Sequence, residues 1–276
     1  MRVWKSFLSY CQKGMGQWSF WGAMVFLCLL CFTSSSAMVD SVSYSVLECL
    51  LRFPLSQRQT ELQFAAISQF QSGMGTYSKM FVPMLAALPT IPLLCRERAN
   101  GALRFILPRS GRTGCTLGFW LASLFCGGLM VFGGYALFGL CCLLLFPSGA
   151  SYGLTAGLCL KMALPYLAGA FPLGASSVSV AVALCGFSRN PYQVLCGSFT
   201  LQYALSTFCS RASLALTDPS GWRYLLIETV EPGAAFNILR LSGQLRWTVP
   251  AFQLLLACVA AGVFRLCLGR RLDCGT

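Results

Sequence analysis

The residue types that carry most enzyme chemistry are scarce in this chain or poorly placed for it. The 276 residues include sixteen cysteines and no histidine. Most of the cysteines lie inside apolar runs, where a thiol behaves as a small buried hydrophobe. The sequence leaves open whether Cys49 and Cys209 form a disulfide. Without histidine the common zinc ligand sets are missing, so we expect no catalytic, cofactor-binding or metal-binding residue on this chain, and no enzymatic activity of its own.

Carboxylates are also sparse, and none falls in the apolar interior of a predicted span. Ion-coupled carriers and proton pumps usually depend on buried ionisable groups, which disfavours that class. The chain has no GxxxxGK[ST] segment, the loop with which P-loop proteins bind ATP phosphates. If the protein uses ATP and Mg, another chain must supply their site.

Composition indicates an all-α integral membrane protein. Hydrophobic residues make up 56% of the chain and charged residues 10%, with a mean hydropathy of +0.67. Soluble domains carry about 25% charged residues, so lipid must cover much of this surface. The net charge of +12 follows from basic residues near the membrane and from attraction to anionic lipid. We therefore expect membrane lipid, and no nucleic acid, among its partners.

Apolar runs between charged segments predict six transmembrane helices in a single transmembrane domain, residues 1–276. A run of about 20 residues crosses the bilayer core as a helix. Residues 1–17 have the spacing of an amphipathic helix lying on the inner membrane surface. The predicted spans are 18–39, 77–95, 116–145, 160–187, 191–210 and 248–268, with external segments at 40–76 and 211–247.

Basic residues predict that both termini lie in the cytoplasm. The segments assigned to the inside hold twelve Lys and Arg against two Asp and Glu, whereas those outside hold eight against six. Short cytoplasmic segments collect Lys and Arg. We expect a multi-pass protein of the cell (plasma) membrane.

Several local features of the spans carry expectations of their own. In the first external segment, Pro54 separates two predicted amphipathic helices, with Glu48–Arg52 and Arg58–Glu61 spaced as ion pairs. Small residues on one face of the third span predict a close helix contact; they are Ser123, Gly127 and Gly134. Prolines remove a backbone donor and bend helices, so five of them are hinge candidates: Pro83, Pro89, Pro92, Pro165 and Pro172.

The charged loop from Arg96 to Arg112 joins the second and third predicted spans. It holds five arginines and one glutamate in seventeen residues. Orientation requires the positive charge but not the glutamate, the glycine or the apolar run after it. Those residues resemble the cytoplasmic loop of ABC-2-type transporter permeases. The resemblance rests on Glu97, Arg98, Gly101, Leu103, Arg104, Phe105, Ile106 and Leu107, followed by Pro108, Ser110 and Arg112.

The resemblance implies the membrane subunit of an ABC exporter. The loop would form a short coupling helix parallel to the membrane, docked in a cleft of a separate ABC ATPase subunit that binds ATP and Mg. Ala99, Leu103, Ile106 and Leu107 would share its docking face, and Glu97 would lie near its start, where the helix dipole favours a negative charge. A second permease copy or a homologous permease would complete the assembly.

The substrate class implied is a peptide, an antibiotic or a lipid-like molecule. Three alternatives remain on the sequence: a non-transporting membrane scaffold or sensor, an ion-coupled carrier, and an intramembrane enzyme.

Overall fold

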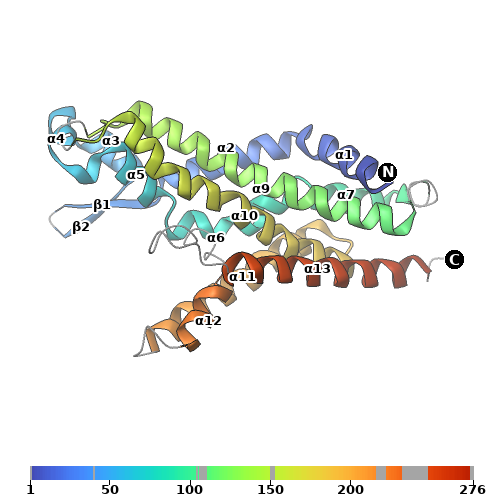
Figure 1. Ribbon diagram of the computed structural model, residues 1–276. Helices are drawn as coiled ribbons and strands as arrows, with labels where there is room; N and C mark the ends of the chain where they lie inside the picture. The colour runs from blue at the N-terminus through green and yellow to red at the C-terminus, as the bar shows by residue number, and fades with distance from the viewer. Residues whose placement is uncertain are drawn as a thin grey trace.

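The computed structural model describes residues 2–39, 41–103, 105, 111–149, 153–215, 222–231 and 248–273. Almost all of its regular structure is helical, with one two-stranded antiparallel hairpin (Figure 1). The elements are α1 (Arg2–Met15), α2 (Trp18–Phe32), β1 (Ser35–Val39), β2 (Val42–Ser45), α3 (Val46–Arg52), α4 (Leu55–Thr60), a 3-10 turn (Leu62–Phe64), α5 (Ala66–Gly73), α6 (Thr76–Ala87), α7 (Ile91–Ala99), α9 (Arg112–Leu145), α10 (Ala156–Phe187), α11 (Pro191–Ala215), α12 (Trp222–Val230) and α13 (Thr248–Asp273).

The fold is built around α9, which packs against α1, α2 and α10. At 1.5 Å per residue its 34 residues extend over about 51 Å, longer than the bilayer core. In turn, α10 contacts α6, α11 and α13. The first residue of α1 and the last of α13 lie at the same end of the bundle, and the hairpin lies at the opposite end (Figure 1).

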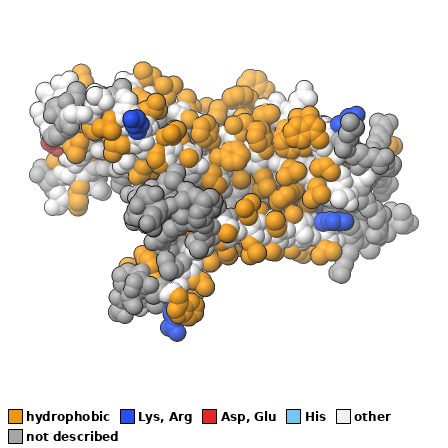
Figure 2. All heavy atoms as spheres, in the orientation of Figure 1, with side chains coloured by type: hydrophobic (Ala, Val, Ile, Leu, Met, Phe, Trp, Pro, Cys, Tyr) orange, Lys and Arg blue, Asp and Glu red, His pale blue; other side chains and the backbone are white. Residues whose placement is uncertain are grey.

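Three helical stretches of the described chain are long and apolar enough to cross a membrane: Ser78–Ala99, which takes in most of α6 and all of α7, Thr113–Leu145 and Gly157–Phe187. The pair α1–α2, bent by 61°, passes the same criterion if it counts as one broken span. Hydrophobic side chains cover much of the described surface between the two ends (Figure 2). These features describe a helical, membrane-embedded protein.

Two of the six predicted spans do not meet this criterion over the residues described. In α11, polar residues such as Gln193 and Gln202 interrupt the apolar run. In α13, the apolar stretch Ala251–Cys267 is shorter than a full crossing.

The first predicted span ends earlier than expected. The helix α2 stops at Phe32, and residues 35–39 form β1 rather than the rest of a span 18–39. Consecutive polar residues follow Phe32, and Ser36 donates from its hydroxyl to the Gln69 Oε1 at 2.7 Å. The chain then reverses through Ser41, which has a φ of 65°. Apolar content alone overestimated this span because it did not register the serine run.

The second span is interrupted, as its prolines predict. Leu88, Pro89 and Thr90 form a turn between α6 and α7, while Pro83 stays inside α6 and Pro92 lies in the first turn of α7. By contrast, α10 continues as one helix through Pro165 and Pro172. The structure therefore places the local unwinding at residues 88–90.

Two of the local features predicted for residues 40–76 are present. Pro54 separates α3 from α4, and Glu48 lies 3.8 Å from Arg52. The pair predicted between Arg58 and Glu61 is wrong. Arg58 instead donates to the Leu145 carbonyl at 3.4 Å, and Glu61 accepts from Gln63.

The other expectations for the segments predicted to be external have a mixed outcome. The thiols of Cys49 and Cys209 are free rather than joined. In the second external segment, α11 continues to Ala215 and α12 covers part of the remainder. Residues 216–221 and 232–247 lie outside the described chain.

Small residues allow α9 and α10 to approach closely, as predicted for the third span. Gly134 lies against α2, where an added Cβ would meet Leu27 at 2.9 Å. A Cβ added at Gly127 would meet Val178 of α10 at 2.2 Å. The contact is reciprocal, since a Cβ at Gly174 of α10 would lie 2.5 Å from the Gly127 carbonyl oxygen. Backbone packing against backbone leaves little room for either helix to shift.

Candidate functional site

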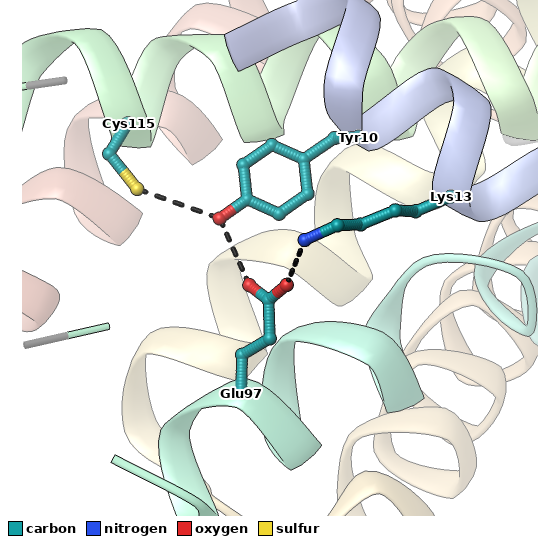
Figure 3. Close-up of polar contacts among 4 residues, drawn as sticks. All are labelled: Tyr10, Lys13, Glu97 and Cys115. Atoms are coloured by element: carbon teal, nitrogen blue, oxygen red, sulfur yellow. Dashed lines mark hydrogen bonds and ion pairs between the residues drawn. The ribbon is translucent and has the colours of Figure 1, made fainter. Parts of the chain in front are cut away.

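The end of α7 carries the first two residues of the predicted coupling loop, and it is tied to three other helices. Glu97 is buried, with 8% of its surface exposed. Tyr10 of α1 donates to its Oε2 at 3.0 Å, and Lys13 Nζ donates to its Oε1 at 2.7 Å. The Tyr10 hydroxyl also lies 3.7 Å from the Cys115 Sγ of α9 (Figure 3). The carboxylate thus joins α7 to α1 and, through Tyr10, to α9.

The sequence of α1 places both partners on one face of that helix. Tyr10 and Lys13 are three residues apart, so their side chains lie one turn apart on the same side. The Tyr10 ring packs edge-on against Phe119 at 5.3 Å, which holds the hydroxyl in place. Close contact with α9 is possible because Gly118 has no Cβ to meet Ser6, which would lie 2.5 Å away. The predicted amphipathic α1 is therefore packed along α9 with its Tyr10 face buried.

Glu97 lies in the last turn of α7, not near the start of a coupling helix as predicted. A negative charge at a helix C-terminus is disfavoured by the helix dipole. The adjacent Lys13 ammonium and the Tyr10 hydroxyl offset this penalty and the cost of removing the carboxylate from water. The local sequence did not indicate this because the compensating groups lie more than eighty residues earlier.

Arg98 links the same turn to the end of α10. Its Nη1 donates to the Cys185 carbonyl and, at 3.3 Å, to the Ser188 carbonyl. The last carbonyls of a helix lack intrahelical partners, and a cation there is favoured by the dipole. Neighbouring residues of α7 therefore attach to α1 on one side and to α10 on the other. Arg98 is one of the residues that carry the resemblance to the coupling loop, and in this structure it bonds within the chain.

Gly101 reverses the chain directly after α7. Asn100 ends the helix, its N–H donating to the Arg96 carbonyl at 2.9 Å, and Gly101 has a φ of +68°. No atom would lie within 4 Å of an added Cβ. Glycine is needed here for its backbone conformation rather than for space.

Among the described residues after Gly101, Leu103 and Phe105 lie in different environments. Leu103 is 3% exposed and belongs to the core, whereas Phe105 is 76% exposed. Ala99, predicted to lie beside Leu103, is exposed. The predicted common face is wrong for Leu103, because that side chain is already packed within the chain. The other predicted coupling residues, Arg104, Ile106 and Leu107, lie outside the described chain.

Sequence reasoning missed Tyr10, Lys13 and Cys115 as members of this site. The spacing of Tyr10 and Lys13 on an amphipathic helix is a usable signal, but it names no partner. Cys115 resembles the other apolar-run cysteines and gives no signal at all.

No three or more Cys, Asp and Glu side chains of the described chain come close enough to hold a metal ion. Cys28 and Cys31 have CxxC spacing, but both thiols are buried among apolar residues of α2. Neither a family model nor a curated protein matches this chain.

Proposed function

We propose that this chain is the permease subunit of an ATP-driven exporter of the ABC-2 type. It crosses the plasma membrane six times with both termini in the cytoplasm, and it assembles with a second permease copy or a homologous permease. An ABC ATPase subunit docks on the loop after α7 and holds ATP and Mg. The exported substrate is a peptide, an antibiotic or a lipid-like molecule.

The observation that carries this proposal is the double attachment at the end of α7. Glu97 bonds to Lys13 and Tyr10 of α1, and Arg98 bonds to the carbonyls that end α10. A segment that only connected two spans would not need both neighbouring residues anchored in this way. A segment that transmits force would.

The arrangement supports a specific route of transmission. Phe105 is exposed just beyond Gly101 and is available to a docked ATPase. When the ATPase closes on ATP, a displacement of this segment reaches α7, and Glu97 and Arg98 pass it to α1 and α10. The turn at residues 88–90 lets α7 tilt relative to α6.

The six-span arrangement accommodates the remaining helices. The first residue of α1 and the last of α13 lie at one end of the bundle, which is consistent with an even number of crossings (Figure 1). In this arrangement α1 and α2 form the first crossing with its bent entry, α6 and α7 the second, and α11 and α13 the last two.

Co-purification and reconstitution test the proposal. The full chain is expressed together with candidate P-loop ATPase subunits, and any complex that forms is purified and placed in liposomes. We expect the ATPase to co-purify. Glu97→Gln and Gly101→Ala are expected to leave the complex assembled and to lower its ATP hydrolysis several-fold. Glu97→Gln weakens the attachment of α7 to α1, and Gly101→Ala disturbs the turn that joins the displaced segment to α7.

Glu48→Gln is the matched control, since this glutamate belongs to α3 at the hairpin end of the bundle and 41% of its side chain is exposed. It should leave hydrolysis unchanged. Failure of any ATPase to associate would refute the proposal, as would unchanged hydrolysis in the assembled Glu97→Gln and Gly101→Ala complexes.

A further inference from the structure

A cavity of about 200 Å³ lies between α6, α10 and α11, beside the end of α12. Part of its wall is apolar and comes from Met80, Pro83 and Leu173. The remainder is polar or charged. The cavity is distant in sequence from the coupling loop, and none of its polar residues was singled out as a site by the sequence patterns.

The polar wall follows one stripe of α11. Gln202, Ser206 and Ser210 are spaced four residues apart, so they lie on the same side of the helix. Gln202 is 5% exposed, and its Nε2 donates to the Ser177 carbonyl of α10 at 3.0 Å. A stripe of this kind is disfavoured against lipid and is expected to line a cavity or a helix contact.

Two opposite charges reach the same cavity from different helices. Lys79 lies in the first turns of α6, and Glu231 follows the last residue of α12. Each is partly shielded from solvent. Charges in a low-dielectric site attract complementary groups more strongly than they do in water, and ionisable groups within a membrane domain mark binding sites by default.

We propose that this cavity binds a small zwitterion that carries an acidic group and a primary amine. The acidic group lies against the Lys79 ammonium and the amine against the Glu231 carboxylate. Hydroxyls of Ser177, Ser206 and Ser210 bond to the polar atoms between them. The volume of the cavity is below the roughly 300–1,000 Å³ of drug-sized sites, so the cavity suits a ligand no larger than an amino acid or a lipid headgroup.

The side of the cavity formed by α11 opens towards the exterior of the bundle. Tyr203 is 46% exposed, Ser210 is exposed, and Leu214, one turn further on, is 87% exposed. A headgroup in the cavity has an apolar surface beside it on which an acyl chain can lie. The zwitterion therefore comes from one of two sources: an aminophospholipid in the bilayer or a free amino acid in solution.

Binding to the purified full chain tests the proposal without an ATPase, so its failure is separate from failure of the coupling proposal. Native mass spectrometry in nanodiscs of defined composition compares phosphatidylethanolamine with phosphatidylglycerol, which lacks the amine. Isothermal titration compares free amino acids with their N-acetyl derivatives. We expect at least a tenfold preference for the amine-bearing partner in one of the two arms.

Variants that remove one charge at a time test the roles proposed for Lys79 and Glu231. Lys79→Met should weaken binding at least tenfold, and Glu231→Gln should remove the preference for the amine while retaining binding of the anion. Lys161→Met, at an exposed lysine, and Glu48→Gln, at a half-buried glutamate, repeat these substitutions at residues that do not line the cavity, and both should bind as the parent chain does. Ser206→Leu, which fills the cavity without changing charge, should also abolish binding in a chain that remains folded.

Each outcome decides the matter. A preference for phosphatidylethanolamine assigns a lipid headgroup, and a preference for free amino acids assigns a soluble ligand. Equal binding of amine-bearing and amine-free partners in both arms overturns the proposal. So does a preference that survives Lys79→Met, Glu231→Gln and Ser206→Leu in variants whose thermal unfolding matches that of the parent chain.

Discussion

The Lys13 Nζ lies 2.7 Å from the Glu97 Oε1. This contact joins two helices through residues that are 84 positions apart in the sequence. The carboxylate is largely buried, whereas 45% of the lysine side chain is exposed. Such a pair stabilises the fold less than a fully buried one, because solvent screens the exposed partner. Losing one partner is nevertheless costly, because the carboxylate stays buried without its counter-charge.

A double-mutant cycle should measure this relationship. We expect Lys13→Met to destabilise the protein by about 2 kcal/mol and Lys13→Met/Glu97→Gln to be less destabilised than the sum of the single variants. The thermal unfolding midpoint in detergent reports the difference. The exposed pair Arg52 and Glu48 is the control, with coupling below about 0.5 kcal/mol. Additive effects of Lys13→Met and Glu97→Gln would show that the two side chains do not interact.

Tyr10 contributes a hydrogen bond that can be removed without changing the packing of its ring. Tyr10→Phe deletes the hydroxyl that donates to Glu97 and keeps the edge contact with Phe119. We expect a loss of about 1.5 kcal/mol, typical of a hydrogen bond to a charged group. Tyr44→Phe is the control, because Tyr44 packs against Phe53 at the hairpin end. Equal unfolding midpoints for both variants would contradict the assigned role of the Tyr10 hydroxyl.

Sequence patterns identified the long helices because their apolar runs are bounded by charges and turn residues. The third and fourth predicted spans correspond to α9 and α10, and the break near Pro89 follows from proline chemistry. The structural effect of polar residues within an apolar run was harder to predict. The serines after Phe32 start a hairpin, and the polar residues of α11 line a cavity.

The site at the end of α7 was predicted only in part. The types of Glu97, Arg98 and Gly101 marked the segment as unusual, but their contacts depend on how distant helices pack. Tyr10 and Lys13 reach Glu97 only because α1 runs along α9. A sequence pattern does not show which distant helices pack together. The prediction therefore placed Glu97 near the start of a helix, whereas it lies in the last turn of α7.

The close contact between α9 and α10 should be intolerant of an added methyl group. A Cβ at Gly174 would lie 2.5 Å from the Gly127 carbonyl oxygen, a backbone atom that cannot move aside alone. We expect Gly174→Ala to cost about 2 kcal/mol, in the range of overpacked cores, and to lower the unfolding midpoint in detergent. Gly157→Ala in the same helix, with nothing within 4 Å, should be neutral or slightly stabilising.

The hairpin end of the molecule should become less stable in acid, because Glu48 becomes protonated there. The pKa of this carboxyl lies below its usual value because the Ser45 backbone N–H donates to it at 2.9 Å, supported by the Ser45 hydroxyl. A lowered pKa means that the stabilisation is present above the unfolded value, about 4.3, and is lost as pH falls through the folded value.

Hydrogen exchange of residues 46–52 is therefore expected to accelerate below about pH 4.3. Glu48→Gln should remove that pH dependence and leave the exchange rate of α9 unchanged. An acid response of α3 that persists in Glu48→Gln would show that another group controls it.

Substitutions at Gly101 distinguish the contribution of the turn after α7 to stability from its contribution to coupling. Alanine at a φ of +68° is strained by about 1 kcal/mol, whereas asparagine enters this region more readily. We expect Gly101→Ala to lower the unfolding midpoint and Gly101→Asn to lower it less. ATP hydrolysis of the assembled complex should follow the same order, because the angle of the segment that carries Phe105 depends on this turn. Gly262→Ala and Gly262→Asn, at a helical position with open space, provide the control. If Gly101→Ala and Gly101→Asn reduce hydrolysis equally, the backbone conformation at Gly101 is not what sets coupling.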